Sequence, residues 1–408
     1  MVGDMQHLSQ FLFHQRGFWL RLPMGELSEL YTAMMLKTFG LSLIGIFVPI
    51  YLYEQGWSIG QVVGFMVLNY AIRLVASRPL AGLIYWLGAK NLMRVGLGLT
   101  IIFLSMLLTI AQIDWPLPLL AAVDAVAISL FYLGYHIDFS QAKKLDEFGR
   151  EAERVFALAK FAAATAPFIG GVLATVFDPR ATIVAALLAI ALAAWPLSRG
   201  AAQVRPPRPT ARFKWNFKRY GRSYLSFAVL GIDQTASVVY WPFLAALFIF
   251  SGEIYLQLGL VTSVSAVTTV LVVHALGKLV DSHRGGLLMT YSAWLSGGLH
   301  LLRTPATSLG QVLGINILSE WFMAGSHMPY LKGMYDEADY ASDRASYIGA
   351  MEAAVNAGRL ALWAIVGLAL LIGHDNETGM RLSFIAAAIL TPLILSHKFA
   401  VLKLEAKV

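Results

Sequence analysis

The chain has 408 residues, of which 58% are hydrophobic and only 13% are charged, and its formal net charge is +7. Soluble domains contain about 25% charged residues, and so few charges cannot cover a water-facing surface of normal polarity. This composition excludes an ordinary soluble enzyme, a disordered chain and a coiled coil. Cysteine is absent, which also excludes a disulfide framework and a thiolate metal site. We expect a polytopic membrane protein.

The segment 1–28 precedes the first apolar stretch. Its apolar and aromatic residues recur at helical spacing, with Arg16 and Arg21 between them. This pattern is typical of a helix that lies in the plane of the lipid headgroups. A frayed terminal tail is the alternative.

Apolar stretches long enough to cross a membrane follow along the rest of the chain. Turn and cap residues, such as Gln55-Gly56 and Asp178-Pro179, separate them. We expect twelve spans, at about residues 30–53, 59–86, 91–112, 116–140, 153–176 and 180–198, and at about 222–250, 255–280, 285–303, 307–333, 345–373 and 379–400.

Basic residues alternate sharply between the connections. Most of the 31 Lys and Arg residues lie in the terminal segments and the even-numbered connections, whereas the odd-numbered connections hold few, namely Arg180, Arg303 and Arg381. Lys and Arg resist translocation, so this pattern predicts that both termini and the long middle connection are cytoplasmic. We expect the membrane to be the bacterial inner membrane.

The middle connection is strongly basic. Between Arg199 and Arg222 it carries eight Lys and Arg residues and no acidic residue. A positive-inside linker that lies against anionic lipid explains this run better than nucleic-acid binding does. The chain is thus divided into an interfacial segment (1–28), a six-helix bundle (29–198), a basic linker (199–221), a second six-helix bundle (222–402) and a tail (403–408).

Short patterns recur at corresponding positions of the two halves, as internal repeats of transporters do. They are Phe47-Val48-Pro49 and Tyr240-Trp241-Pro242, the stretches RPLAGLIYWLGAKN and VHALGKLVDSHRGG, Tyr135-His136 and His327-Met328, and Glu153-Arg154 and Asp343-Arg344.

On these features the chain resembles the major facilitator superfamily, whose loop signature is roughly G-x-L-x-D-x-x-G-x-R/K. The second copy here keeps Gly277, Leu279, Asp281 and Arg284, and the first keeps Gly82, Gly88 and Lys90 but has Tyr85 in place of the acid. The resemblance implies an all-α polytopic membrane protein with twelve transmembrane helices in two pseudo-symmetric six-helix bundles.

The resemblance also implies a cytoplasmic gate, in which Asp281 holds Arg154 at the start of the fifth span. Because Tyr85 replaces the acid, the matching lock beside Arg344 lacks its carboxylate. The gate residues expected from the resemblance are Gly82, Lys90, Arg154, Gly277, Asp281, Arg284 and Arg344. The alternative is that Asp281 only caps a helix or a turn.

Ionisable groups inside spans are costly and usually face a cavity or a partner. In the resembled family spans one, four, seven and ten line the central cavity, and here each of them carries an ionisable residue. The candidates for a substrate and coupling cavity are Lys37, Arg73, Asp124, His136, Lys160, Asp233, Gln234, Asn316, Glu320, Glu352, Asn356 and Arg359.

The first half of this set is mainly cationic and the second mainly anionic, so we expect charge pairs across the interface between the bundles. Lys37 stands in the repeat close to Asp233, and Lys160 close to Glu352. The alternative for Lys37, Lys160 and Glu352 is snorkelling toward the nearby cytoplasmic ends of their helices.

These features favour a secondary active transporter that moves a small solute by alternating access, with protons as a candidate coupling ion. No nucleotide-binding G-x-x-x-x-G-K-[ST] sequence occurs. We expect no cofactor, no metal site, no nucleic-acid partner and a monomer in contact with membrane lipids.

Two alternatives remain. One is an intramembrane enzyme acting on a lipid or prenyl substrate, with magnesium held by Asp336, Glu337, Asp339 and Asp343. The other is a transporter-like receptor or assembly factor, because a fold does not fix a function.

Overall fold

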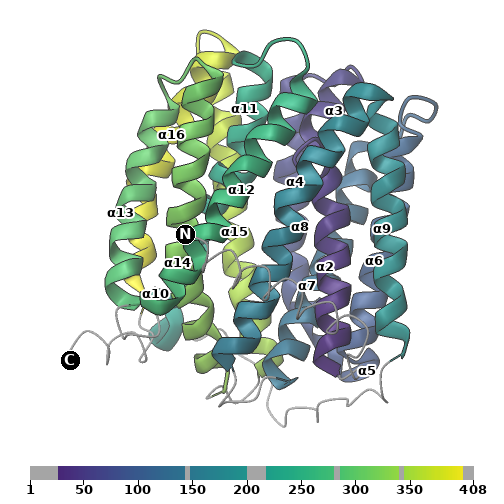
Figure 1. The fold of residues 1–408 in the computed structure, drawn as a ribbon, viewed down its shortest axis with the longest axis vertical. Coiled ribbons are helices and arrows are strands. Elements are labelled where there is room, and N and C mark those ends of the chain that lie inside the picture. The colour runs from purple at the N-terminus through teal and green to yellow at the C-terminus, as the bar shows by residue number, and fades with distance from the viewer. Residues whose placement is uncertain (1–25, 143–147, 200–216, 280–284, 340–343, 398–408) are drawn as a thin grey trace, which may run out of the picture.

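The computed structural model describes residues 26–142, 148–199, 217–279, 285–339 and 344–397. The described residues form long helices that run up and down beside one another (Figure 1). The all-α polytopic fold expected from the sequence is therefore confirmed in this part of the chain.

The first half consists of rods that follow one another antiparallel. The first rod is α2 (Glu26–Ile44) followed by α3 (Val48–Glu54), and the second is α4 (Ile59–Gly82) followed by the short α5 (Ile84–Leu87). The remaining rods are α6 (Ala89–Leu108), α7 (Leu117–Ala142), α8 (Phe148–Val176) and α9 (Pro179–Arg199).

The second half repeats this plan. Its first rod is α10 (Phe217–Thr235), the π-helical turn η2 (Ala236–Tyr240) and α11 (Trp241–Phe248). The others are α12 (Ile254–Leu279), α13 (Gly285–Arg303), α14 (Leu309–Asp339), α15 (Arg344–Ile372), and α16 (Asn376–Leu390) with the 3-10 turn η4 (Thr391–Ser396).

Each predicted span corresponds to one of these rods. The ends that differ most from the prediction are the start of α8 at Phe148, the start of α10 at Phe217, inside the predicted linker, and the end of α14 at Asp339. In the described residues, 8 helices are long and apolar enough to cross a membrane. The rods below that threshold include α10–α11, α13 and α14, and these rods carry many of the buried polar side chains described below.

The molecule has two ends, which we call the α3 end and the α5 end after the short helices that lie there (Figure 1). Near the α3 end, a new helix begins at the repeated proline pattern in the first rod of each half. Pro49 opens α3 and Pro242 opens α11, positions where the missing N–H of proline leaves no helical hydrogen bond unmade. Helices α3 and α11 contact each other across the halves.

Two pairs of long helices join the halves: α4 packs along α15, and α8 packs along α12. Glycine permits the second crossing. A Cβ atom built on Gly171 of α8 would lie 2.5 Å from the carbonyl oxygen of Tyr255 on α12. The two backbones are thus in direct contact, as small residues allow in membrane helices.

We predict that Gly171→Ala destabilises the protein by about 1–3 kcal/mol, because the added methyl group overpacks a backbone contact between the halves. The measurement is the thermal unfolding midpoint of the purified protein in detergent. The matched control is Gly98→Ala on α6, where an added Cβ meets no atom within 4 Å. Equal unfolding midpoints for the two variants would show that the α8–α12 crossing accommodates an added methyl group.

Candidate functional site

An ion pair inside the first half joins α4 to α7. Arg73 Nη2 lies 3.3 Å from Asp124 Oδ2, and the Asn69 side-chain amide donates to the same oxygen at 2.7 Å. Asn69 also donates to the carbonyl oxygen of Ala121 at 3.3 Å. Asn69 and Arg73 are four residues apart, so they share one face of α4 and reach Asp124 together.

Lys37 of α2 lies beside this pair and is 0% exposed. Its Nζ atom is 3.6 Å from the ring centroid of Tyr132 and 4.2 Å from that of Phe131, both on α7. No hydrogen-bond acceptor in the described part of the chain reaches this ammonium group. The side chain therefore points into the protein and does not snorkel to the helix end.

Arg359 of α15 belongs to the second half and faces the first. It donates to Gln234 Oε1 on α10 at 3.2 Å and to Asn356 Oδ1 at 3.3 Å, and the Gln234 amide nitrogen lies 3.0 Å from Nδ1 of His327. The guanidinium carbon of Arg359 is 5.9 Å from the ring of Tyr70, and that of Arg73 is 5.0 Å from the same ring. Tyr70 thus bridges cations from the two halves.

His136 of α7 contacts two residues of the second half directly. Its Nε2 atom lies 3.4 Å from Glu352 Oε1 on α15, and its Nδ1 atom lies 2.6 Å from the hydroxyl of Tyr335 on α14. Asn356 adds a 3.4 Å hydrogen bond to Ser77 of α4. We call Lys37, Tyr70, Arg73, Asp124, Tyr132, His136, Gln234, Tyr335, Glu352, Asn356 and Arg359 the interface cluster.

The cross-interface charge pairs take a different form from the one expected. Asp233 does not pair with Lys37, and the side chain of Lys160 lies outside what the structure describes. Among the described residues, His136 and Glu352 form one contact between an imidazole and a carboxylate of opposite halves.

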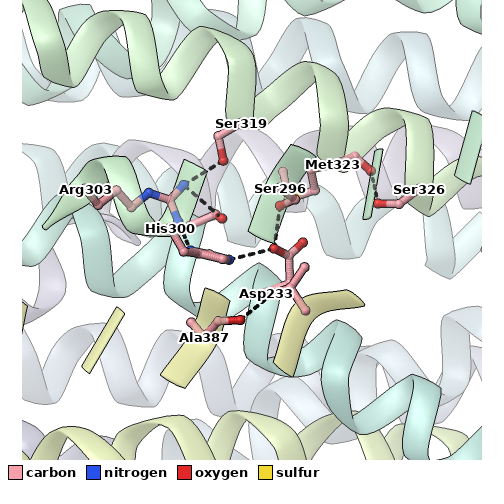
Figure 2. A network of polar contacts seen from close by, with 10 residues as sticks. Asp233, Ser296, His300, Arg303, Ser319, Met323, Ser326 and Ala387 are labelled. Atoms are coloured by element: carbon pink, nitrogen blue, oxygen red, sulfur yellow. Dashed lines mark hydrogen bonds and ion pairs between the residues drawn. The ribbon is translucent and has the colours of Figure 1, made fainter. Parts of the chain in front are cut away.

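Asp233 belongs to a second buried group, shown in Figure 2. Asp233 Oδ1 accepts hydrogen bonds from Ser296 Oγ at 2.6 Å and from His300 Nε2 at 2.9 Å. His300 Nδ1 accepts from Arg303 Nη1, so this imidazole is neutral with its proton on Nε2. Asp233 Oδ2 has no hydrogen-bond partner within the described residues.

Arg303 links this buried group to residues that line a cavity. Its Nη2 atom donates to Ser319 Oγ at 2.7 Å and to Ser237 Oγ at 3.1 Å, and both serines line the cavity. We call Asp233, Ser296, His300, Arg303, Ser237 and Ser319 the Asp233 network. Its members come from α10, η2, α13 and α14.

The cavity is a partly open space lined by side chains of both halves. Its polar wall consists of Ser237, Thr262, Ser265, Asn316, Ser319 and Glu320. The apolar wall includes Val238 and Pro242, and Ile46 of the first half closes it. The structure therefore places the predicted candidates Asn316 and Glu320 here, away from the interface cluster.

Arg303 ends α13, as the predicted span 285–303 implies, but it was not among the candidates for a functional site. It is 0% exposed and is directed into the Asp233 network. His300 was not among the candidates. Both residues lie on one face of α13, three positions apart, and that spacing in an apolar helix is the signal that could have identified them.

The expected gate is only partly within the described residues. Gly82 ends α4, Lys90 is buried near the start of α6, and Arg344 begins α15. Asp281 and Arg284 lie outside the described residues, as do the side chains of Arg154 and Gly277.

At the α3 end, a contact missing from the sequence-based candidates joins the halves. The Tyr255 hydroxyl of α12 donates to Glu54 Oε2 at the end of α3. The ring of Tyr255 also lies 5.2 Å from that of Phe47. The α3 end of the interface is thus held by specific contacts.

The described part of the chain contains no group of three or more metal-binding side chains. The acidic stretch considered for magnesium is mostly the last turn of α14, where Glu337 Oε2 accepts a hydrogen bond from the Tyr347 hydroxyl at 2.7 Å. The side chains of Asp336, Asp339 and Asp343 lie outside what the structure describes.

No known protein-family model matches the chain, and no curated protein matches its sequence. Solved structures match its fold. A POT family transporter in complex with a thioalcohol-conjugated peptide matches with a TM-score of 0.70 and 11% identity, over 90% of this chain and 95% of that chain. The major facilitator superfamily transporter FucP, in the outward conformation, matches with a TM-score of 0.63 and 12% identity, over 93% of this chain and 98% of that chain. The chain has the major facilitator fold, as its resemblance to that superfamily implied.

We predict that Lys37→Met raises the thermal unfolding midpoint of the purified protein. Burying an ammonium group without an acceptor costs several kcal/mol, more than the roughly 0.5–2 kcal/mol that contacts with aromatic rings return. The control is Lys218→Met at the exposed start of α10, where we expect no change. A lower midpoint for Lys37→Met would identify Lys37 as a structural residue.

Proposed function

We propose that this protein is a secondary active transporter that moves a small solute by alternating access between its two six-helix bundles. The observation that carries the proposal is the interface cluster, in which α2, α4 and α7 of one half meet α10, α14 and α15 of the other. Intramembrane charges that face a partner bundle mark solute and ion pathways. The major facilitator fold of the chain is the second support.

Two sets of contacts between the halves would break during alternating access. His136 with Glu352 and Tyr335 holds the halves together within the bundle, and Tyr255 with Glu54 holds them at the α3 end. Rocking about the α4–α15 and α8–α12 crossings would open one set while the other stays closed. The α5 end faces the cytoplasm in this proposal, because the basic connections lie there.

We further propose that protons drive the transport through Asp233. His300 and Ser296 both donate to Oδ1, so only Oδ2 of this carboxylate can take a proton without displacing a hydrogen bond. Protonation would weaken the attraction of Asp233 for the His300–Arg303 side of the network, which borders the cavity. A monomer in the bacterial inner membrane, surrounded by lipid and without a cofactor, completes the proposal.

The absence of native cysteine makes a direct test available. In Val238→Cys, whose side chain lines the cavity, we expect labelling by a membrane-impermeant maleimide from both sides, in right-side-out and in inside-out vesicles. The control is Val75→Cys on α4, which is 74% exposed toward lipid and should resist labelling from either side. Labelling of Val238→Cys from one side only would contradict alternating access.

The same variant tests proton coupling without a known solute. The ratio of labelling rates from the two sides should change between neutral and acidic pH, because protonation of Asp233 biases the two states. Adding Asp233→Asn should make this ratio independent of pH. A ratio that stays pH-dependent in the double variant would exclude Asp233 as the coupling residue.

A further inference from the structure

The cavity wall next to Arg303 has a fixed hydrogen-bonding polarity. A guanidinium group carries donors only, so Ser237 and Ser319 must each accept from Arg303. Each hydroxyl then has its own hydrogen left to donate. Within the described residues neither hydroxyl donates to an acceptor. Both hydroxyls line the cavity, so this part of the wall offers donors to a bound molecule.

The charge behind the two serines strengthens this preference. The Asp233 network runs from a carboxylate, through a neutral imidazole, to the guanidinium of Arg303 (Figure 2). Its cationic end contacts Ser237 and Ser319, which line the cavity. Arg303 is fully buried, so water screens its field weakly. Hydroxyl donors backed by a buried cation favour a carboxylate.

The same cavity presents the opposite charge on Glu320, the residue after Ser319 on α14. Successive helical residues point about 100° apart, so the carboxylate of Glu320 and the hydroxyl of Ser319 face different parts of the space. The carboxylate of Glu320 favours an ammonium group. Ile46, Val238 and Pro242 give the remaining wall an apolar surface.

We infer that the cavity binds a small zwitterion with an apolar side group, its carboxylate on Ser237 and Ser319 and its ammonium group on Glu320. This inference rests on the proposed transport function, because it names the class of solute that the cavity would carry. The cavity contains its own reference residue: Ser265 also lines it, but its hydroxyl already donates to the carbonyl oxygen of Val261 at 2.8 Å.

The test uses three probes of one shape: L-valine, L-valinamide, which lacks the carboxylate, and 3-methylbutanoate, which lacks the ammonium group. Binding to the purified full-length protein is measured by calorimetry and by thermal stabilisation. We expect L-valine to bind at least about tenfold more tightly than either analogue, because the loss of hydrogen bonds to a charged group raises Kd by about that factor.

Variants assign the two ends of the probe. Ser237→Ala combined with Ser319→Ala should remove the preference for L-valine over L-valinamide, and Glu320→Gln should remove the preference over 3-methylbutanoate. Ser265→Ala should bind all three probes as the parent protein does. Retention of both preferences in these variants would overturn the assignment of the residues.

Equal affinity for the three probes, or no binding of L-valine at millimolar concentration, would overturn the inference itself. These outcomes leave the transport proposal standing if Val238→Cys is still labelled from both sides. Labelling from one side only, together with selective binding of L-valine, would instead indicate a zwitterion receptor with this fold.

Discussion

The free-energy cost of removing charged side chains from water constrains how the helices of this protein pack. Only 13% of its residues are charged, and those inside the helices must find partners within the protein. Arg73 finds Asp124, and Arg303 finds Asp233 through His300. Each of these pairs lies within one half of the molecule. Movement of one half relative to the other would leave these two charge pairs intact.

The contacts between the halves are correspondingly weaker. They consist of backbone packing at glycine, such as Gly171, and of polar contacts that include His136 with Glu352 and Tyr255 with Glu54. Such contacts are exchangeable, because a histidine or a tyrosine can be satisfied by another partner at little cost. Lys37, inside the first half, lacks such a contact: its ammonium group is buried, and no acceptor among the described residues forms a hydrogen bond with it. A group of this kind gains most from a conformational change or from a ligand.

The sequence allowed the spans and the repeat to be predicted, because apolar length and the alternation of basic loops follow directly from the properties of a bilayer. It also identified Arg73, Asp124 and Arg359, since an ionisable residue within a span stands out from its neighbours. The pairing of these residues could not be predicted, because it depends on how helices far apart in the chain pack. The burial of Arg303 was missed for a related reason: near a helix end, tertiary packing decides whether a side chain points outward or inward. Tyr70, Tyr132 and Tyr335 gave no signal, because aromatic residues are common in all membrane helices.

The central claim is that the two bundles exchange between two arrangements about this interface. The most direct measurement is the distance between two spin labels attached to introduced cysteines in lipid bilayers. One pair of cysteines replaces Gln112 and Asn376 at the α3 end, and the other replaces Leu87 and Lys218 at the α5 end. We predict two distance populations for each pair, with the longer distance gaining at one end as it declines at the other when pH or solute is changed. A single unchanging distance at both ends would contradict the account.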